Sequence, residues 1–111
     1  MNLQPFESAL QRIRPILLAR GFRLDYVERP EAGAGVALAE YFAGEVRLRL
    51  VWEGREHALW VESARQAGAQ VVSRWQDVEW TVAGHRLPLD QDLSEARIER
   101  LESALQRFLA R

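Results

Sequence analysis

The stretch VRLRLVWEGREHALWVE, residues 46–62, decides the fold. Apolar and polar residues alternate on both sides of a central Glu-Gly-Arg-Glu, which is the pattern of two antiparallel strands joined by a turn. A two-residue loop that begins with Gly54 suits a type II′ turn and places Trp52 opposite His57. The alternation then predicts one apolar face, which consists of Val46, Leu48, Leu50, Trp52, Leu59 and Val61.

The opposite face of this hairpin carries charged residues and a tryptophan. The same register sets Arg49 against Trp60, and a turn at the Ala-Gly that follows residues 36–42 sets Glu40 beside Arg47. With Glu62 on the other side, Arg47 lies between two glutamates. Such a cross-strand ladder of solvated charges contributes only about a few tenths of a kcal/mol per pair.

An amphipathic helix is expected on each side of the strands. In residues 5–20 the apolar stripe is Phe6, Leu10, Ile13 and Leu17. Pro15 falls inside this helix and predicts a kink or a split, whereas Gly21 predicts a clear end. A second helix, capped by Asp92 and reaching almost to Arg111, has the stripe Ile98, Leu101, Leu105 and Phe108.

The remaining segments complete a meander of about five to six strands. Residues 23–28 and 36–42 precede the central hairpin, and residues 78–82 and 85–89 alternate as two further strands. Residues 63–70 are a loop or a short helix. Because both helix stripes and one sheet face need covering, we expect residues 1–111 to form a single two-layer α+β domain, with the N- and C-terminal helices packed on one face of an antiparallel sheet.

Composition excludes several kinds of chemistry. The 111 residues include no cysteine, and all fifteen basic residues are arginine, so thiolate sites, Schiff-base lysines and P-loop lysines are absent. His57 and His85 fit no metal-ligand spacing, so we expect no metal and no cofactor. None of the five serines lies in a nucleophile elbow, and we therefore predict no catalytic residue.

Charge and hydropathy limit the partners. A net charge of −1 gives no general attraction to nucleic acid or to an anionic membrane, and no apolar run is long enough to span a bilayer. The start of the chain lacks the pattern of a secretion signal, so a cytoplasmic location is expected. An arginine-rich, lysine-free chain is typical of a GC-rich bacterial genome.

Three functional classes follow from these features. A non-catalytic protein-interaction domain, comparable with immunity proteins or dimeric secretion chaperones, explains the surplus of Trp and Arg, which are enriched at binding hot spots. Its partner is another protein or a second copy, and its predicted contact residues are Glu40, Arg47, Arg49, Trp60 and Glu62. The alternative is a small enzyme or ligand-binding domain with a pocket near Trp52 and His57. An RNA-binding sheet is disfavoured, because the aromatic residues are surrounded by glutamates and no basic stripe accompanies them.

Overall fold

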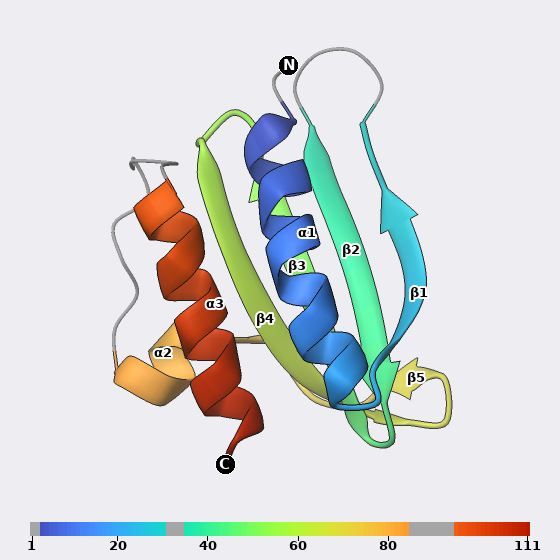
Figure 1. The fold of residues 1–111 in the computed structure, drawn as a ribbon. Coiled ribbons are helices and arrows are strands. Elements are labelled where there is room, and N and C mark those ends of the chain that lie inside the picture. The colour runs from blue at the N-terminus through green and yellow to red at the C-terminus, as the bar shows by residue number, and fades with distance from the viewer. Residues whose placement is uncertain (1–2, 31–34, 85–94) are drawn as a thin grey trace.

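The computed structural model describes residues 3–30, 35–84 and 95–111. It is an α+β fold in which an antiparallel sheet curves into a half-barrel, and helices pack against its inner face (Figure 1). In chain order the elements are α1 (Gln4–Ala19), β1 (Arg23–Glu28), β2 (Val36–Ala43), β3 (Val46–Glu53), β4 (Ala58–Ala67), β5 (Gln70–Val71), β6 (Gln76–Asp77), α2 (Val78–Ala83) and α3 (Glu95–Leu109). The predicted fold class is therefore confirmed.

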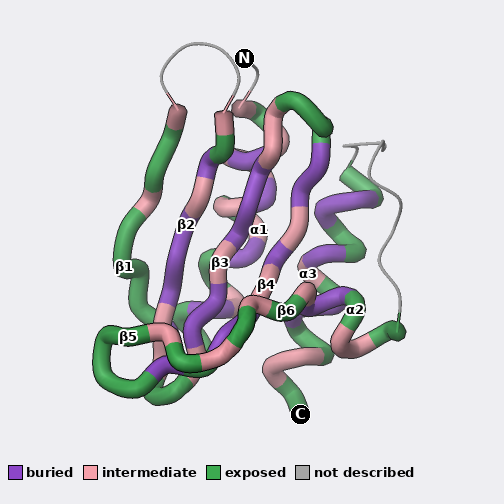
Figure 2. Tube along the Cα trace, turned by 180° about the vertical axis from the view of Figure 1, so that it is seen from behind, coloured by how far each residue is buried: buried purple, intermediate pink, exposed green. Residues whose placement is uncertain are grey.

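The sheet is a meander at its centre. Its hydrogen-bonded order is β1-β2-β3-β4-β5, and β6 pairs with β4 as well, through Glu62 with Asp77 and Ser63 with Gln76. Both β5 and β6 are only two residues long. Figure 2 shows from behind that they lie across one end of the sheet, while the other end of β2, β3 and β4 stays uncovered by described elements.

The core lies between the inner sheet face and the helices. Leu48, Leu50 and Trp52 of β3 are almost fully buried, as are Leu59 and Val61 of β4. The helices bury Phe6, Ile13, Leu17, Ile98, Leu101 and Leu105 against them. The hairpin's apolar alternation thus identifies the inner face correctly, although Val46, at the end of the strand, is only half-buried.

Helix α1 is a single helix that runs through Pro15 without being split. It ends as Gly21 predicts. Gly21 has a φ of +82°, its N–H donates to Leu18 O at 3.1 Å, and the N–H of Phe22 donates to Leu17 O at 3.0 Å. This pair of bonds is a Schellman motif, and it folds the buried Phe22 back onto the last turn.

Two segments differ from the sequence-based expectation. The predicted loop or short helix at residues 63–70 is wrong over most of its length, because β4 continues as a strand to Ala67. The predicted strand at residues 78–82 is also wrong, since these residues lie in α2. Asp77 is its N-cap and accepts a hydrogen bond from Trp80 N at 3.0 Å. In so short a segment the spacing of Val78 and Val82 fits a helix as well as alternation fits a strand.

The expected strand at residues 85–89 and the cap at Asp92 lie outside the described residues.

Candidate functional site

The outer face of the sheet carries a row of polar residues that crosses four strands. The paired residues are Tyr26 of β1, Glu40 of β2, Arg49 of β3 and Glu62 of β4. Arg49, and not Arg47, is therefore the cross-strand neighbour of Glu40, and Trp60 pairs with Val51 instead of Arg49. The predicted register is wrong by two residues in both hairpins.

Loop geometry explains both errors. Residues 54–57 form a four-residue loop in which His57 takes a φ of +50°, so Trp52 pairs with Leu59 and not with His57. The β2–β3 turn is centred on Gly44, whose φ is +58°, and the residue after it. Because strand side chains alternate with a period of two, a shift of two keeps every residue on its predicted face.

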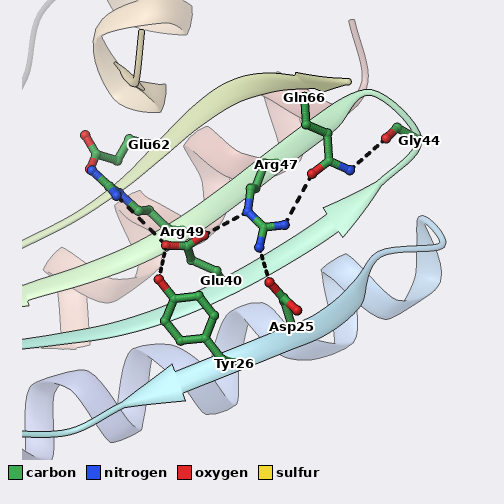
Figure 3. Close-up of polar contacts among 8 residues, drawn as sticks. All are labelled: Asp25, Tyr26, Glu40, Gly44, Arg47, Arg49, Glu62 and Gln66. Carbon is green, nitrogen blue, oxygen red and sulfur yellow. Dashed lines mark hydrogen bonds and ion pairs between the residues drawn. The ribbon is translucent and has the colours of Figure 1, made fainter. Parts of the chain in front are cut away.

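Arg47 is buried among acceptors from three strands. The side chain of Arg47 is 10% exposed, and that of Glu40 is 7% exposed. Arg47 Nε donates to Glu40 Oε1 at 2.8 Å. The two terminal nitrogens donate to Gln66 Oε1 at 3.2 Å and to Asp25 (Figure 3). Gln66 in turn donates to Gly44 O at 2.9 Å. The expectation of a solvated ladder is therefore wrong at Arg47 and Glu40.

The charge of Arg47 is retained despite this burial. Burial lowers its pKa, but the hydrogen bond that Arg47 donates to Glu40 and the negative charges of Asp25 and Glu40 outweigh it, so the pKa is raised above its ordinary value. A positive group held between two carboxylates is a structural bridge, with no nitrogen left over to bind an anion. Arg47 therefore joins β1, β2 and β4 to β3 on the outer face.

Arg49 is more open and touches an aromatic ring. Its Nε donates to Glu62 Oε1 at 2.6 Å, and its Nη1 lies 3.9 Å from Glu40 Oε2. The guanidinium stacks over the indole ring of Trp75 at 3.9 Å from the ring centroid, a close cation–π contact. The side chain keeps 25% of its surface exposed. The ion pairs with Glu40 and Glu62 and the contact with Trp75 fix the position of this guanidinium.

Tyr26 ends the polar row at the free edge strand. Its hydroxyl donates to Glu40 Oε2 at 2.5 Å, and that hydrogen bond, with partial burial, raises the pKa of Tyr26 to about 12. The residue itself is 41% exposed. A neutral, hydrogen-bonded phenol at a sheet edge presents an apolar ring to solvent while its polar end is satisfied.

Beside the polar row lies a parallel apolar row, which we call the outer stripe: Leu38, Val51 and Trp60. Val51 is buried, and Leu38 and Trp60 are half-buried. Val36, at the start of β2, extends the stripe and is 39% exposed. The partial exposure expected for Trp60 is therefore what the structure shows. No helix within the described residues packs over this part of the sheet (Figure 2).

Trp52 and His57 lie together but border no described cavity. Their rings meet edge to face at 6.0 Å between centroids, with Trp52 buried and His57 exposed in the β3–β4 loop. The indole N–H of Trp52 has no acceptor among the described residues. Three cavities of about 530, 340 and 320 Å³ in the described part of the chain are lined by other residues. A pocket at Trp52 and His57 stays a prediction.

A second buried ion pair, which the sequence did not predict, joins Arg97 and Glu79. Arg97 of α3 donates through one nitrogen to Glu79 Oε1 at 2.7 Å and to Leu59 O at 2.8 Å. Arg97 lies four residues before Leu101, which places both on the buried face of α3. This helical spacing is the sequence feature that could have predicted the burial of Arg97. Asp25, Gln66 and Trp75 were also missed, because β1's bulge and the long β4 were not foreseen.

The described residues hold no group of three or more His, Cys, Asp or Glu side chains suited to a metal ion. None of their helices is long and apolar enough to cross a bilayer. The chain matches no protein-family model, and neither curated proteins nor solved structures give a significant match. Any function must therefore be argued from this geometry.

Proposed function

We propose that this chain is a non-catalytic protein-interaction domain that binds a protein partner, or a second copy of itself, through the outer face of its sheet. The observation that carries the proposal is the outer stripe. Leu38 and Trp60 are only half-buried on a face that no described helix covers, while both amphipathic helices are used on the inner face. Exposed apolar rows bordered by polar residues are typical of binding surfaces.

The neighbouring charges suit a partner contact. Arg49, Glu62 and Glu40 are already paired with one another, so a partner that covers them leaves no isolated charge behind. Trp and Arg at the centre of an interface contribute most to its binding energy. Arg47, buried beneath, supports this surface without forming part of it.

The residue composition supports a particular class of binding protein. The chain has little catalytic chemistry, and its lysine-free, arginine-rich sequence favours a bacterial origin. Small bacterial immunity proteins and secretion chaperones, which act in the cytoplasm by binding another protein, are the functional class that we infer for it.

Trp60→Ala tests the outer stripe, and Trp80→Ala is its matched control. Trp80 is 60% exposed on α2, outside the stripe. Sedimentation analysis of the unmodified protein shows whether it self-associates. If it does, we expect Trp60→Ala to weaken association by about 2 kcal/mol or more, roughly thirtyfold, and Trp80→Ala to leave it unchanged.

If the unmodified protein is monomeric, the same pair of variants is used to capture a partner from the native host. The partner should be retained by Trp80→Ala and lost by Trp60→Ala. Leu38→Ala provides a second variant of the stripe should Trp60→Ala unfold the chain. Identical behaviour of the stripe variants and Trp80→Ala in both assays would refute the outer face as the binding surface.

A further inference from the structure

Two cavities adjoin at the end of the molecule where α1 and α3 finish beside the β2–β3 turn (Figure 1). The larger has a volume of about 530 Å³, and the smaller has a volume of about 340 Å³. Val46, Phe108 and Arg111 line both of them. A single bound molecule can therefore occupy the two together, and we call them the terminal recess.

The walls of the terminal recess divide by chemistry. The larger cavity has apolar walls, mainly Phe22, Val46, Phe108 and Leu109, with Arg20 at its side. The smaller is lined by hydroxyl, amide and guanidinium groups from Ser63, Ser73, Thr81, Gln76, Arg65, Arg74 and Arg111. No aspartate or glutamate lines either cavity. The recess is thus apolar at one end and positively charged at the other.

The arginines of the smaller cavity form no ion pair among the described residues, as is also true of Arg14, Arg23 and Arg55, but they differ from those three in lining one cavity together. Arg12, Arg29, Arg47, Arg49 and Arg97 each form an ion pair with a carboxylate. Within the described ranges, Arg65, Arg74 and Arg111 form none. In a chain with a net charge of −1, three unpaired guanidinium groups around one cavity are a local excess of positive charge.

Hydrogen bonds fix the charged wall. Ser73 Oγ accepts the N–H of Arg65 at 2.8 Å and donates to Arg74 O at 3.2 Å. The N–H of Val72 donates to Arg65 O at 2.9 Å. These bonds tie β4 to the segment that follows β5, so the arginines at residues 65 and 74 are carried on a preorganised backbone. Arg111 lies over the Phe108 ring at 5.9 Å, between the charged and apolar ends.

We propose that the terminal recess binds a small organic anion. Its phosphate or carboxylate group lies against Arg65, Arg74 and Arg111, and its apolar body lies against Phe22 and Phe108. Guanidinium groups match the oxygens of phosphate and carboxylate, and ligand sites of a few hundred Å³ with apolar walls and few polar anchors are common. This site is at the opposite end of the sheet from the outer stripe and does not depend on the function proposed there.

Calorimetric titration with 1-naphthyl phosphate tests the proposal. We expect saturable binding of one molecule per chain, weakened about tenfold or more by Arg65→Gln and by Arg74→Gln, since each removes a charged hydrogen-bond donor. Arg55→Gln is the matched control, because Arg55 is exposed in the β3–β4 loop and lines neither cavity. All three arginines are exposed, so these variants should fold, as far-ultraviolet circular dichroism will verify.

Two further probes assign the parts of the ligand. 1-Naphthoate replaces the phosphate by a carboxylate and shows which anion is preferred. Inorganic phosphate lacks the apolar body and should bind at least about tenfold more weakly, as should 1-naphthyl phosphate to Phe108→Ala. The proposal is overturned if neither naphthyl anion binds saturably, if Arg65→Gln and Arg74→Gln bind as tightly as Arg55→Gln, or if inorganic phosphate binds as well as the naphthyl anions.

Discussion

Arg47 and Arg97 are both buried arginines that bond to the same sheet, yet they are held in different ways. Arg47 lies on the outer face and bonds to Glu40, Asp25 and Gln66 through all three of its guanidinium nitrogens. Arg97 reaches β4 from α3, and one nitrogen makes both of its bonds while Nη1 has no partner among the described residues. The comparison shows that burial alone does not determine how strongly a charge is supported.

The two arginines also join different elements of the fold. The Arg47 network joins β1, β2, β3 and β4 within the sheet, whereas Arg97 joins two helices to the edge of β4. Leu59 O is a carbonyl that the neighbouring strand leaves available, and Arg97 satisfies it, so this edge of the sheet is capped. Among the described residues nothing pairs with the outer edge of β1, at the opposite side.

Arg97→Ala should produce the largest loss of stability. It leaves the carboxylate of Glu79, whose side chain is 9% exposed, without its ionic partner. Breaking a buried pair costs about 3–5 kcal/mol, and denaturant unfolding measures it directly. Replacing both partners, as Arg97→Met with Glu79→Leu, should recover most of that loss. A cost below about 1 kcal/mol for Arg97→Ala would show that Glu79 is solvated in solution.

Arg47→Ala should cost less, about 2–3 kcal/mol of unfolding free energy. Glu40 keeps two other partners, the Tyr26 hydroxyl and the more distant Arg49 guanidinium, so its charge is not left alone. The solvated ladder predicted from the sequence would contribute only about a few tenths of a kcal/mol per pair. Arg55→Ala, in the exposed β3–β4 loop, serves as the control that should leave the denaturation midpoint unchanged. A loss for Arg47→Ala equal to that for Arg97→Ala would remove the distinction between the two networks.

Asp25→Ala should have a still smaller effect, below about 1 kcal/mol. Its carboxylate contacts Arg47, but the side chain is 43% exposed and water can replace it. The same unfolding experiment, repeated at high salt, should reduce the effect further because exposed pairs are screened. A loss of several kcal/mol would mean that Asp25, and not Glu40, is the main counter-charge of Arg47.

The sequence predicted the faces of the sheet better than its pairing. Alternation in β3 and β4 identifies Leu50, Trp52 and Leu59 as inner residues whatever the loop lengths, because the side-chain period is two. Pairing depends on loop conformation, and a left-handed φ at His57 is not visible in composition. The candidate residues Glu40, Arg49 and Glu62 were therefore placed on the correct face but matched with the wrong neighbours.

Other features depend on contacts between distant segments. Trp75 reaches Arg49 only because β6 returns alongside β4, and α2 is closed by an Asp77 cap within a sequence that also alternates like a strand. Local patterns are weakest in such short elements, where tertiary packing decides between helix and strand. The burial of Glu79 and Arg97 follows from the same packing.

The smallest effect at neutral pH is expected at Tyr26, and its signature is a shifted titration. An ordinary tyrosine has a pKa of 10.0, and the hydrogen bond to Glu40 raises that of Tyr26 to about 12. Because the folded state favours the neutral phenol, the bond's contribution is complete below pH 10 and is lost as the pH rises toward about 12.

The chain has two tyrosines, and burial raises the pKa of Tyr41 as well. In Tyr41→Phe, ultraviolet absorbance of the phenolate therefore reports Tyr26 alone, and we expect its midpoint near 12. Adding Glu40→Gln removes the negative acceptor and should return the midpoint toward 10 if the protein stays folded, which circular dichroism at each pH will show. A midpoint near 10 already in Tyr41→Phe would mean that the Tyr26–Glu40 bond does not form in solution, and Glu40 would then depend on Arg47 much as Glu79 depends on Arg97.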